Sequence, residues 1–155
     1  MWEPKLILSN GELIPFADAR VHPLSLAVAY ATTVFEGLRA YRDPASGDFL
    51  LFRLDEHVRR LQVGMKLLRM DRVLGLDEIR EGLARLVRAN APDDDVYIRL
   101  LAYVEGIGLM ATTGPVGWTA AAMPREKSKF ADTGMSLGVS SWSRLADNAS
   151  PPRIK

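Results

Sequence analysis

Residues 34–41 read VFEGLRAY, and this stretch decides the fold because its alternate positions differ in character. In a β-strand successive side chains point to opposite faces, so residues two positions apart share a face. One face would carry the aromatic, glycine and basic residues Phe35, Gly37, Arg39 and Tyr41. The other face would carry Glu36, Leu38 and Ala40. The pattern therefore predicts a strand with one aromatic and basic face.

Further strands are predicted on both sides of this stretch. The pair Asn10-Gly11 separates the runs 5–9 and 12–16, and Asn-Gly is favoured where both central residues of a hairpin turn need positive φ. After a turn signal at 43–48, the next apolar run is expected to pair back as a strand at 49–52. Later candidate strands cover residues 96–104, 118–123 and 135–142.

Two amphipathic helices are predicted between the early and the late strands. The first covers residues 56–69 with Asp55 as its N-cap, because apolar residues recur there at spacings of three or four. The second covers residues 77–90 and stops before Pro92. Hairpins followed by helices and then by more strands favour an α+β fold with a mostly antiparallel sheet.

Composition narrows the classes of function. The 155 residues are 48% hydrophobic and 25% charged, which is typical of a globular protein, and the absence of cysteine excludes thiolate chemistry. A net charge of +1 predicts no strong field toward nucleic acid or an anionic membrane. No apolar run approaches the ~20 residues that a membrane span requires, and the first residues lack the pattern of a signal peptide. A cytoplasmic location is therefore expected, with neither a nucleic-acid nor a membrane partner.

Three arginines and two histidines are the candidates for a charged site. His22 and His57 have no acidic company at ligand spacing, so no metal site is expected. Arg60 lies near the apolar stripe of the first helix, where a guanidinium needs an anion, and a nearby carboxylate is the favoured partner on pattern alone. Arg39 and Arg99 lie in strand-like runs. They either bind a small carboxylate in an aromatic-lined site or point outward from edge strands, and the pattern leaves both readings open.

Four segments, in this order, resemble motifs of the branched-chain aminotransferases, which are fold-type IV pyridoxal-phosphate enzymes. Residues 30–41 resemble a signature of that family, and residues 56–61 resemble its phosphate-binding helix. Residues 96–99 resemble its Tyr-Ile-Arg-Pro strand. Residues 140–144 and 151–155 resemble the approach to its Schiff-base lysine. The resemblance covers nearly the whole chain, and four motifs at consistent spacing are far more specific than any one.

The resemblance implies a role for individual residues. Lys155 would be catalytic: it would bind pyridoxal 5'-phosphate covalently and move a proton between the substrate Cα and C4′ of the cofactor. Arg60 would hold the cofactor phosphate. Tyr97 and Arg99 would contact substrate carboxylates. The remaining substrate-binding residues would line the side-chain pocket: Tyr30, Phe35, Gly37 and Arg39. Of these, Tyr30 would reach the site of a neighbouring subunit.

The function implied by the resemblance is pyridoxal-phosphate-dependent transamination between a branched-chain or related hydrophobic amino acid and 2-oxoglutarate, in a homodimer or higher homo-oligomer. A D-amino-acid or R-amine transaminase of the same fold is an alternative, as is a non-catalytic dimerisation or binding module. Such enzymes are about twice this long. Residues 1–125 would therefore form the small α+β domain, and residues 126–155 the interdomain segment and first strand of a larger cofactor-binding domain.

Overall fold

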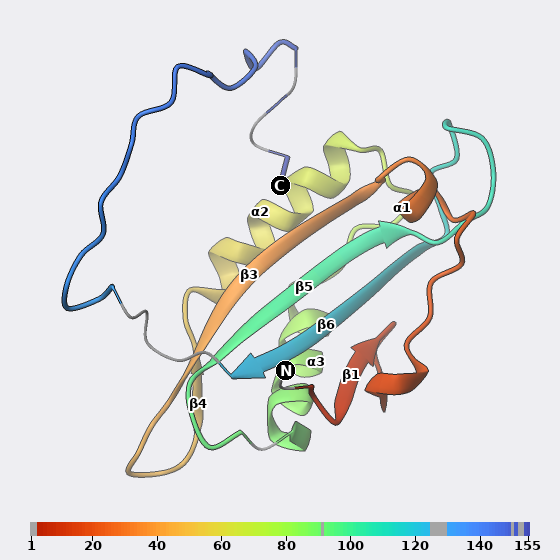
Figure 1. Ribbon diagram of the computed structural model, residues 1–155. Helices are drawn as coiled ribbons and strands as arrows, with labels where there is room; N and C mark the ends of the chain where they lie inside the picture. Colours follow the sequence, from red (N-terminus) through yellow and green to blue (C-terminus); the bar gives the residue numbers. More distant parts are fainter. Residues whose placement is uncertain (1–2, 91, 125–129, 150, 152–153) are drawn as a thin grey trace.

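The computed structural model describes residues 3–90, 92–124, 130–149, 151 and 154–155, and contains one six-stranded sheet with two helices packed against it (Figure 1). The strand order is β2-β1-β6-β5-β3-β4, and every neighbouring pair is antiparallel. The α+β prediction is confirmed. The elements are β1 Leu6–Ser9, β2 Glu12–Pro15, a 3-10 turn Phe16–Asp18, α1 Leu26–Ala29, β3 Thr33–Arg42, β4 Phe49–Leu51, α2 Leu54–Leu67, α3 Leu76–Asn90, β5 Val96–Val104 and β6 Val116–Pro124.

The predicted hairpin forms from β1 and β2 at one edge of the sheet. Asn10 and Gly11 have φ values of 50° and 88°, as the turn requires, and Ser9 pairs with Glu12 across it. The Asn10 side chain then fastens the hairpin to β6, because its Oδ1 accepts a hydrogen bond from the Trp118 backbone N–H at 2.8 Å. β1 thereby joins the sheet beside β6.

The core lies between one face of the sheet and helices α2 and α3. β3 contributes its even-numbered positions to this layer, and β5 does the same. The fully buried residues of the core include Leu38, Val58, Met65, Ile79, Leu83, Leu86, Ile98 and Leu100. The opposite face of the sheet carries no helix in the part of the chain described (Figure 1). One face of β3 is thus sealed, and the other is available for binding.

Helix α2 begins and ends earlier than the sequence predicts. Its N-cap is Arg53, in the left-handed conformation at φ 50°, so Asp55 lies in the first turn and forms an ion pair with Arg80 at 3.1 Å. The N-cap prediction for Asp55 is therefore wrong. The helix stops at Leu67 because Arg69 adopts φ 54° and cannot continue it.

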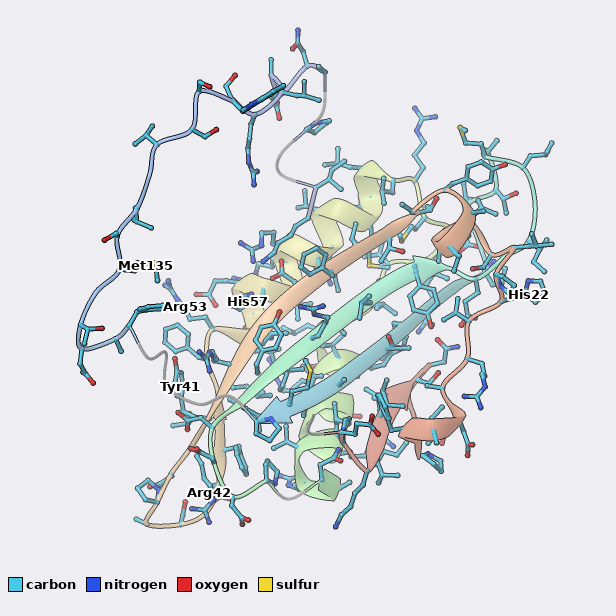
Figure 2. All side chains as sticks on the ribbon, viewed as in Figure 1. His22, Tyr41, Arg42, Arg53, His57 and Met135 are labelled. Atoms are coloured by element: carbon cyan, nitrogen blue, oxygen red, sulfur yellow. The ribbon has the colours of Figure 1, made fainter. Side chains whose placement is uncertain are left out.

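The predicted strand at 135–142 does not form. Leu137, Val139 and Trp142 are 83%, 103% and 91% exposed, and this segment runs away from the sheet (Figures 1 and 2). Apolar alternation produces a strand only where a neighbouring strand supplies hydrogen bonds, and no described strand lies beside it. The predicted domain boundary at 125/126 falls outside the described residues and stays a prediction. In the described residues, no helix is both long enough and apolar enough to cross a bilayer.

Candidate functional site

A buried carboxylate on β3 is the centre of the candidate site. The alternation of β3 places Glu36 on the helix-covered face, where its exposure is 0%. His57 and Arg60 face it from α2, three residues apart and therefore on one side of that helix. Glu36 Oε1 accepts a hydrogen bond from Arg60 Nε at 2.5 Å, and Oε2 accepts one from Arg60 Nη2 at 2.6 Å. His57 Nδ1 lies 2.9 Å from the same Oε2. The expectation that Arg60 pairs with a carboxylate is confirmed.

Lys155 reaches this cluster along a free edge of β3. β4 pairs with β3 only at residues 40–42, so the first part of that edge is open. There the Phe35 backbone N–H donates to the Lys155 carbonyl at 2.8 Å. The Lys155 Nζ lies 3.9 Å from Glu36 Oε2 and 5.4 Å from the centre of the Phe35 ring. Two residues that the sequence predicts to work together, Arg60 and Lys155, thus meet at one carboxylate.

The electrostatics of the cluster keep this carboxylate ionised. Burial raises the pKa of Glu36, but the hydrogen bonds from Arg60 and His57 and the charges of Arg60 and Lys155 outweigh it, so the pKa lies below the ordinary value of 4.5. The hydrogen bond to Glu36 in turn raises the pKa of Arg60. The side chains of Arg60 and Lys155 are 48% and 40% exposed, whereas that of Glu36 is 1% exposed. The cations therefore face solvent above a buried anion, and this arrangement suits an anionic ligand.

The other predicted substrate residues lie on the helix-free face of the sheet. Gly37 pairs with Arg99, and Arg39 pairs with Tyr97, across β3 and β5. The Tyr97 ring lies over Gly37 so closely that a Cβ at position 37 would be 2.5 Å from the hydroxyl oxygen. Arg99 Cζ lies 5.7 Å from the centre of the Tyr97 ring, a cation–π distance. Because β5 lies between β6 and β3, the edge-strand reading is wrong for Arg99. Arg39 lies on β3 just before the residues that β4 pairs, so among the described residues one side of β3 has no strand partner at that position.

Tyr30 lies apart from the cluster around Glu36. It follows α1 as the C-cap residue and is 48% exposed. It makes no hydrogen bond with Glu36, Arg60 or Lys155 in the described chain. The structure therefore brings seven of the eight predicted residues to β3, β5, α2 and the edge of β3, and leaves Tyr30 at the end of α1.

Sequence reasoning missed Glu36 and His57 as members of the site. A signal for Glu36 was present, since an acidic residue in the buried face of a strand needs a cation, and Arg60 needed an anion. His57 could have been found from its position one helical turn before Arg60. Figure 2 shows that His57 lies beside β3 while His22 lies on the opposite side of the molecule. Among the described residues no three His, Asp or Glu side chains are arranged to hold a metal ion.

A cavity of about 660 Å³ lies elsewhere, between the β3–β4 turn and α3. It is lined by apolar residues such as Phe49, Leu51 and Leu83, with Arg42 and Arg88 also in its wall. None of the predicted site residues lines it. The candidate site is therefore defined by its side-chain contacts and not by the shape of the surface of this chain.

Known proteins resemble this chain over most of its length. The family described as Amino-transferase class IV matches residues 33–155. The branched-chain-amino-acid aminotransferase of Salmonella typhimurium is 37% identical over 153 residues, covering 94% of this chain and 48% of the relative. The probable branched-chain-amino-acid aminotransferase of Synechocystis sp. is 35% identical over 148 residues, with the same coverage. The chain thus spans about half the length of the curated relatives it matches.

Solved structures give the same result. The branched-chain amino acid aminotransferase of Thermobaculum terrenum, in its PLP-bound holo-form, matches with a TM-score of 0.83 and 37% identity, over 98% of this chain and 50% of that one. The branched-chain aminotransferase of Thermoproteus uzoniensis, solved with norvaline, matches with a TM-score of 0.85 and 30% identity, over 96% and 50%. Since the family match covers most of the chain, this chain belongs to the class IV aminotransferases, and the relatives and solved structures that it resembles are branched-chain aminotransferases.

Proposed function

We propose that this chain forms part of the active site of a pyridoxal-phosphate-dependent aminotransferase that transfers the amino group of a branched-chain or related hydrophobic amino acid to 2-oxoglutarate. The observation that carries the proposal is the convergence of a lysine amine and an arginine guanidinium on Glu36. The names and cofactor states of the matched relatives support the same reaction.

The residues present fit pyridoxal 5'-phosphate. This cofactor has an aldehyde, which needs an amine, and a phosphate dianion, which needs a cation nearby. Lys155 Nζ supplies the amine, and the partly exposed Arg60 supplies the cation. Glu36 engages Nε and Nη2 of Arg60, while Nη1 makes no hydrogen bond to the described chain and is left for a phosphate oxygen. When bound, the cofactor supplies the electron sink that stabilises negative charge at the substrate Cα.

The residues of this chain would then act as follows. Arg60 binds the phosphate and fixes the cofactor at the edge of β3. Lys155 Nζ, which lies beside Phe35, would move a proton from the substrate Cα to C4′ of the cofactor, and would move a proton in the opposite direction in the second half of the reaction. Phe35 and Gly37 line an apolar surface for the aliphatic side chain. Arg99 on β5 binds the distal carboxylate of the glutamate side of the reaction, because a guanidinium pairs well with a planar carboxylate.

The rest of the assembly belongs to the same proposal. The helix-free face of the sheet carries Arg39, Tyr97 and Arg99, and would be covered by the larger domain that begins after residue 125. Tyr30, which is exposed at the end of α1, would complete the site of a second subunit in a homodimer. A cytoplasmic location accords with this reaction.

The test uses the full-length protein that contains this chain. We expect the purified holoenzyme to convert L-leucine, L-isoleucine or L-valine with 2-oxoglutarate, and we expect borohydride to fix a phosphopyridoxyl group on Lys155. Lys155→Ala should abolish turnover, and Lys66→Ala, on an exposed face of α2, is the matched control. Faster turnover of D-amino acids or R-amines would favour the alternative transaminases. A protein without bound cofactor or turnover would contradict the proposal.

A further inference from the structure

Glu36 carries a charge in a layer where the fold needs none. It lies between Val34 and Leu38 in the buried face of β3, and all three are at most 1% exposed. A buried ion pair is often no more stabilising than an apolar side chain of similar volume, because desolvation offsets the attraction. Packing of β3 against α2 would therefore be served equally well by an apolar residue. The role of the Glu36 carboxylate must therefore be sought in the groups that it contacts.

Among the described residues, the hydrogen bonds and ion pairs of this carboxylate go to the basic groups of His57, Arg60 and Lys155. Its two oxygens accept hydrogen bonds from Nε and Nη2 of Arg60, and this bidentate geometry fixes the plane of the guanidinium. Oε2 also lies 2.9 Å from His57 Nδ1. Because the carboxylate is ionised and can only accept, His57 must donate through Nδ1, and this fixes its tautomer. Arg60 is thus held by two bonds and Glu36 itself by a third from His57.

The contact with Lys155 differs from the contact with Arg60. Lys155 Nζ lies 3.9 Å from Oε2, which is too long for a hydrogen bond but close enough for charge attraction. The backbone of Lys155 is tied to the adjacent residue, Phe35, at 2.8 Å. The amine is therefore drawn toward the carboxylate without being locked to it, as a group that must react and move a proton requires.

From these contacts we infer that Glu36 is a positioning residue of the active site: it orients the Arg60 guanidinium toward the cofactor phosphate and holds the Lys155 amine beside it, from the buried side of β3. The inference rests on the proposed function, since it assigns a role within that site. The role assigned to Glu36 needs no contact with substrate or cofactor. It acts through Arg60 and Lys155.

If Glu36 positions Arg60, then removing its charge should weaken phosphate binding, whereas electrostatic attraction alone would make that binding tighter. Removing a buried negative charge beside Arg60 leaves the guanidinium less neutralised, so charge alone would tighten the binding of a phosphate. Loss of orientation would weaken it. In Glu36→Gln the amide keeps the size of the side chain but offers a single acceptor oxygen, so it cannot accept from both Nε and Nη2 through separate oxygens. Weaker phosphate binding therefore identifies positioning.

The experiment measures the dissociation constant of the full-length protein, freed of cofactor, for pyridoxal 5'-phosphate and for pyridoxal, which lacks the phosphate. For Glu36→Gln we expect the constant for pyridoxal 5'-phosphate to rise about tenfold or more, and that for pyridoxal to rise much less, since a bond to a charged group is lost. Glu36→Asp should recover part of the affinity. Glu56→Gln, an exposed glutamate of α2 paired with Arg53, is the matched control and should change neither constant.

Three results would overturn the inference. The first is an unchanged or tighter binding of pyridoxal 5'-phosphate by Glu36→Gln. The second is an equal loss for both ligands together with a lower melting temperature of the cofactor-free protein, which would make Glu36 purely structural. The third is a Glu36→Asp variant that folds but binds pyridoxal 5'-phosphate no better than Glu36→Gln does. If Glu36→Gln does not fold, the dissociation constants of Glu36→Asp are compared with those of the wild type instead. If the wild-type protein binds no cofactor, the proposed function fails first, and that outcome is distinct from the other three.

Discussion

Substituting Gly37 by alanine tests the contact between β3 and β5 at the substrate face. An added Cβ would lie 2.5 Å from the Tyr97 hydroxyl oxygen, 2.8 Å from Cε2 and 3.0 Å from Cζ. Carbon atoms in contact are comfortable at about 3.5–4.0 Å, so the ring must move by at least about 0.7 Å. Since Tyr97 is part-buried on the helix-free face, the ring can rotate away. The substitution is therefore expected to displace Tyr97 without unfolding the sheet.

The magnitude follows from two opposing contributions. Overpacking costs about 1–3 kcal/mol in a closed core, and the low end applies here because Tyr97 is only part-buried. Replacing glycine lowers the entropy of the unfolded chain, which offsets about 0.4–1 kcal/mol. The free energy of unfolding should therefore change by less than about 1 kcal/mol. The kcat/KM should fall by roughly tenfold, because a displacement near 1 Å at a substrate-positioning group is costly for catalysis.

The assay compares the kcat/KM for L-leucine with the dissociation constant for the cofactor. Gly37→Ala should lower the first and leave the second unchanged, because Arg60 is held by Glu36 on the opposite face of β3. Gly138→Ala is the matched control, since a Cβ there meets nothing within 4 Å. In a Tyr97→Ala background, adding Gly37→Ala should have little further effect. Wild-type kcat/KM in Gly37→Ala, or the same loss in both backgrounds, would refute the reasoning.

The remaining predictions concern charges. Arg60→Ala removes the paired donor of a buried carboxylate and should lower the free energy of unfolding by about 1–3 kcal/mol, measured by denaturant titration at neutral pH; no loss would contradict the pairing. The pKa of Glu36 is lowered in the folded protein, so its ionised form contributes stability above pH 4.5, and this contribution is lost as the pH falls through the pKa of the folded state. The difference in the free energy of unfolding between wild type and Glu36→Gln should therefore shrink in acid. Burial, with the charge and hydrogen bond of Glu105, raises the pKa of Tyr103 from 10.0 to about 12. Stability should therefore fall as the pH rises from 10 to 12, and Tyr103→Phe should remove that part of the dependence; an unchanged profile would count against it.

The elements that local pattern specifies were predicted well. The strand expected at 96–104 matches β5 in both bounds, because its apolar run is flanked by turn signals on both sides. The Asn10-Gly11 hairpin forms for a reason contained in two residues. The α2 N-terminus was missed because Arg53 adopts a left-handed conformation that its residue type does not favour. The strand at 135–142 was wrong because a strand depends on a partner, and periodicity describes only one side of that pair.

For the candidate site, the sequence predicts individual residues but not the contacts between them. The resemblance to the aminotransferase family is what implies a shared site for Arg60, Lys155, Tyr97 and Arg99, whereas alternation alone predicts that Phe35 and Gly37 share one face of a strand. Glu36 joins a residue on α2 to the last residue of the chain, and such long-range pairing leaves no local periodicity to read. The sequence alone allows only the deduction that a buried Glu36 needs a cation and that Arg60 needs an anion. The structure shows that they partner each other.

The register of β3 explains how a single strand serves both parts of the site. Glu36 points to the helix layer, where Arg60 binds it, while Phe35 and Gly37 point to the helix-free face beside Tyr97. Side chains on opposite faces of a sheet cannot touch one another, so a group that serves both faces must lie at a strand edge. β4 leaves that edge free near Phe35, and Lys155 occupies it, with its amine near both the Glu36 carboxylate and the Phe35 ring. A slip of one residue in β3 would exchange the two faces and separate Arg60 from its carboxylate, so the same alternation that builds the core also fixes the candidate chemistry.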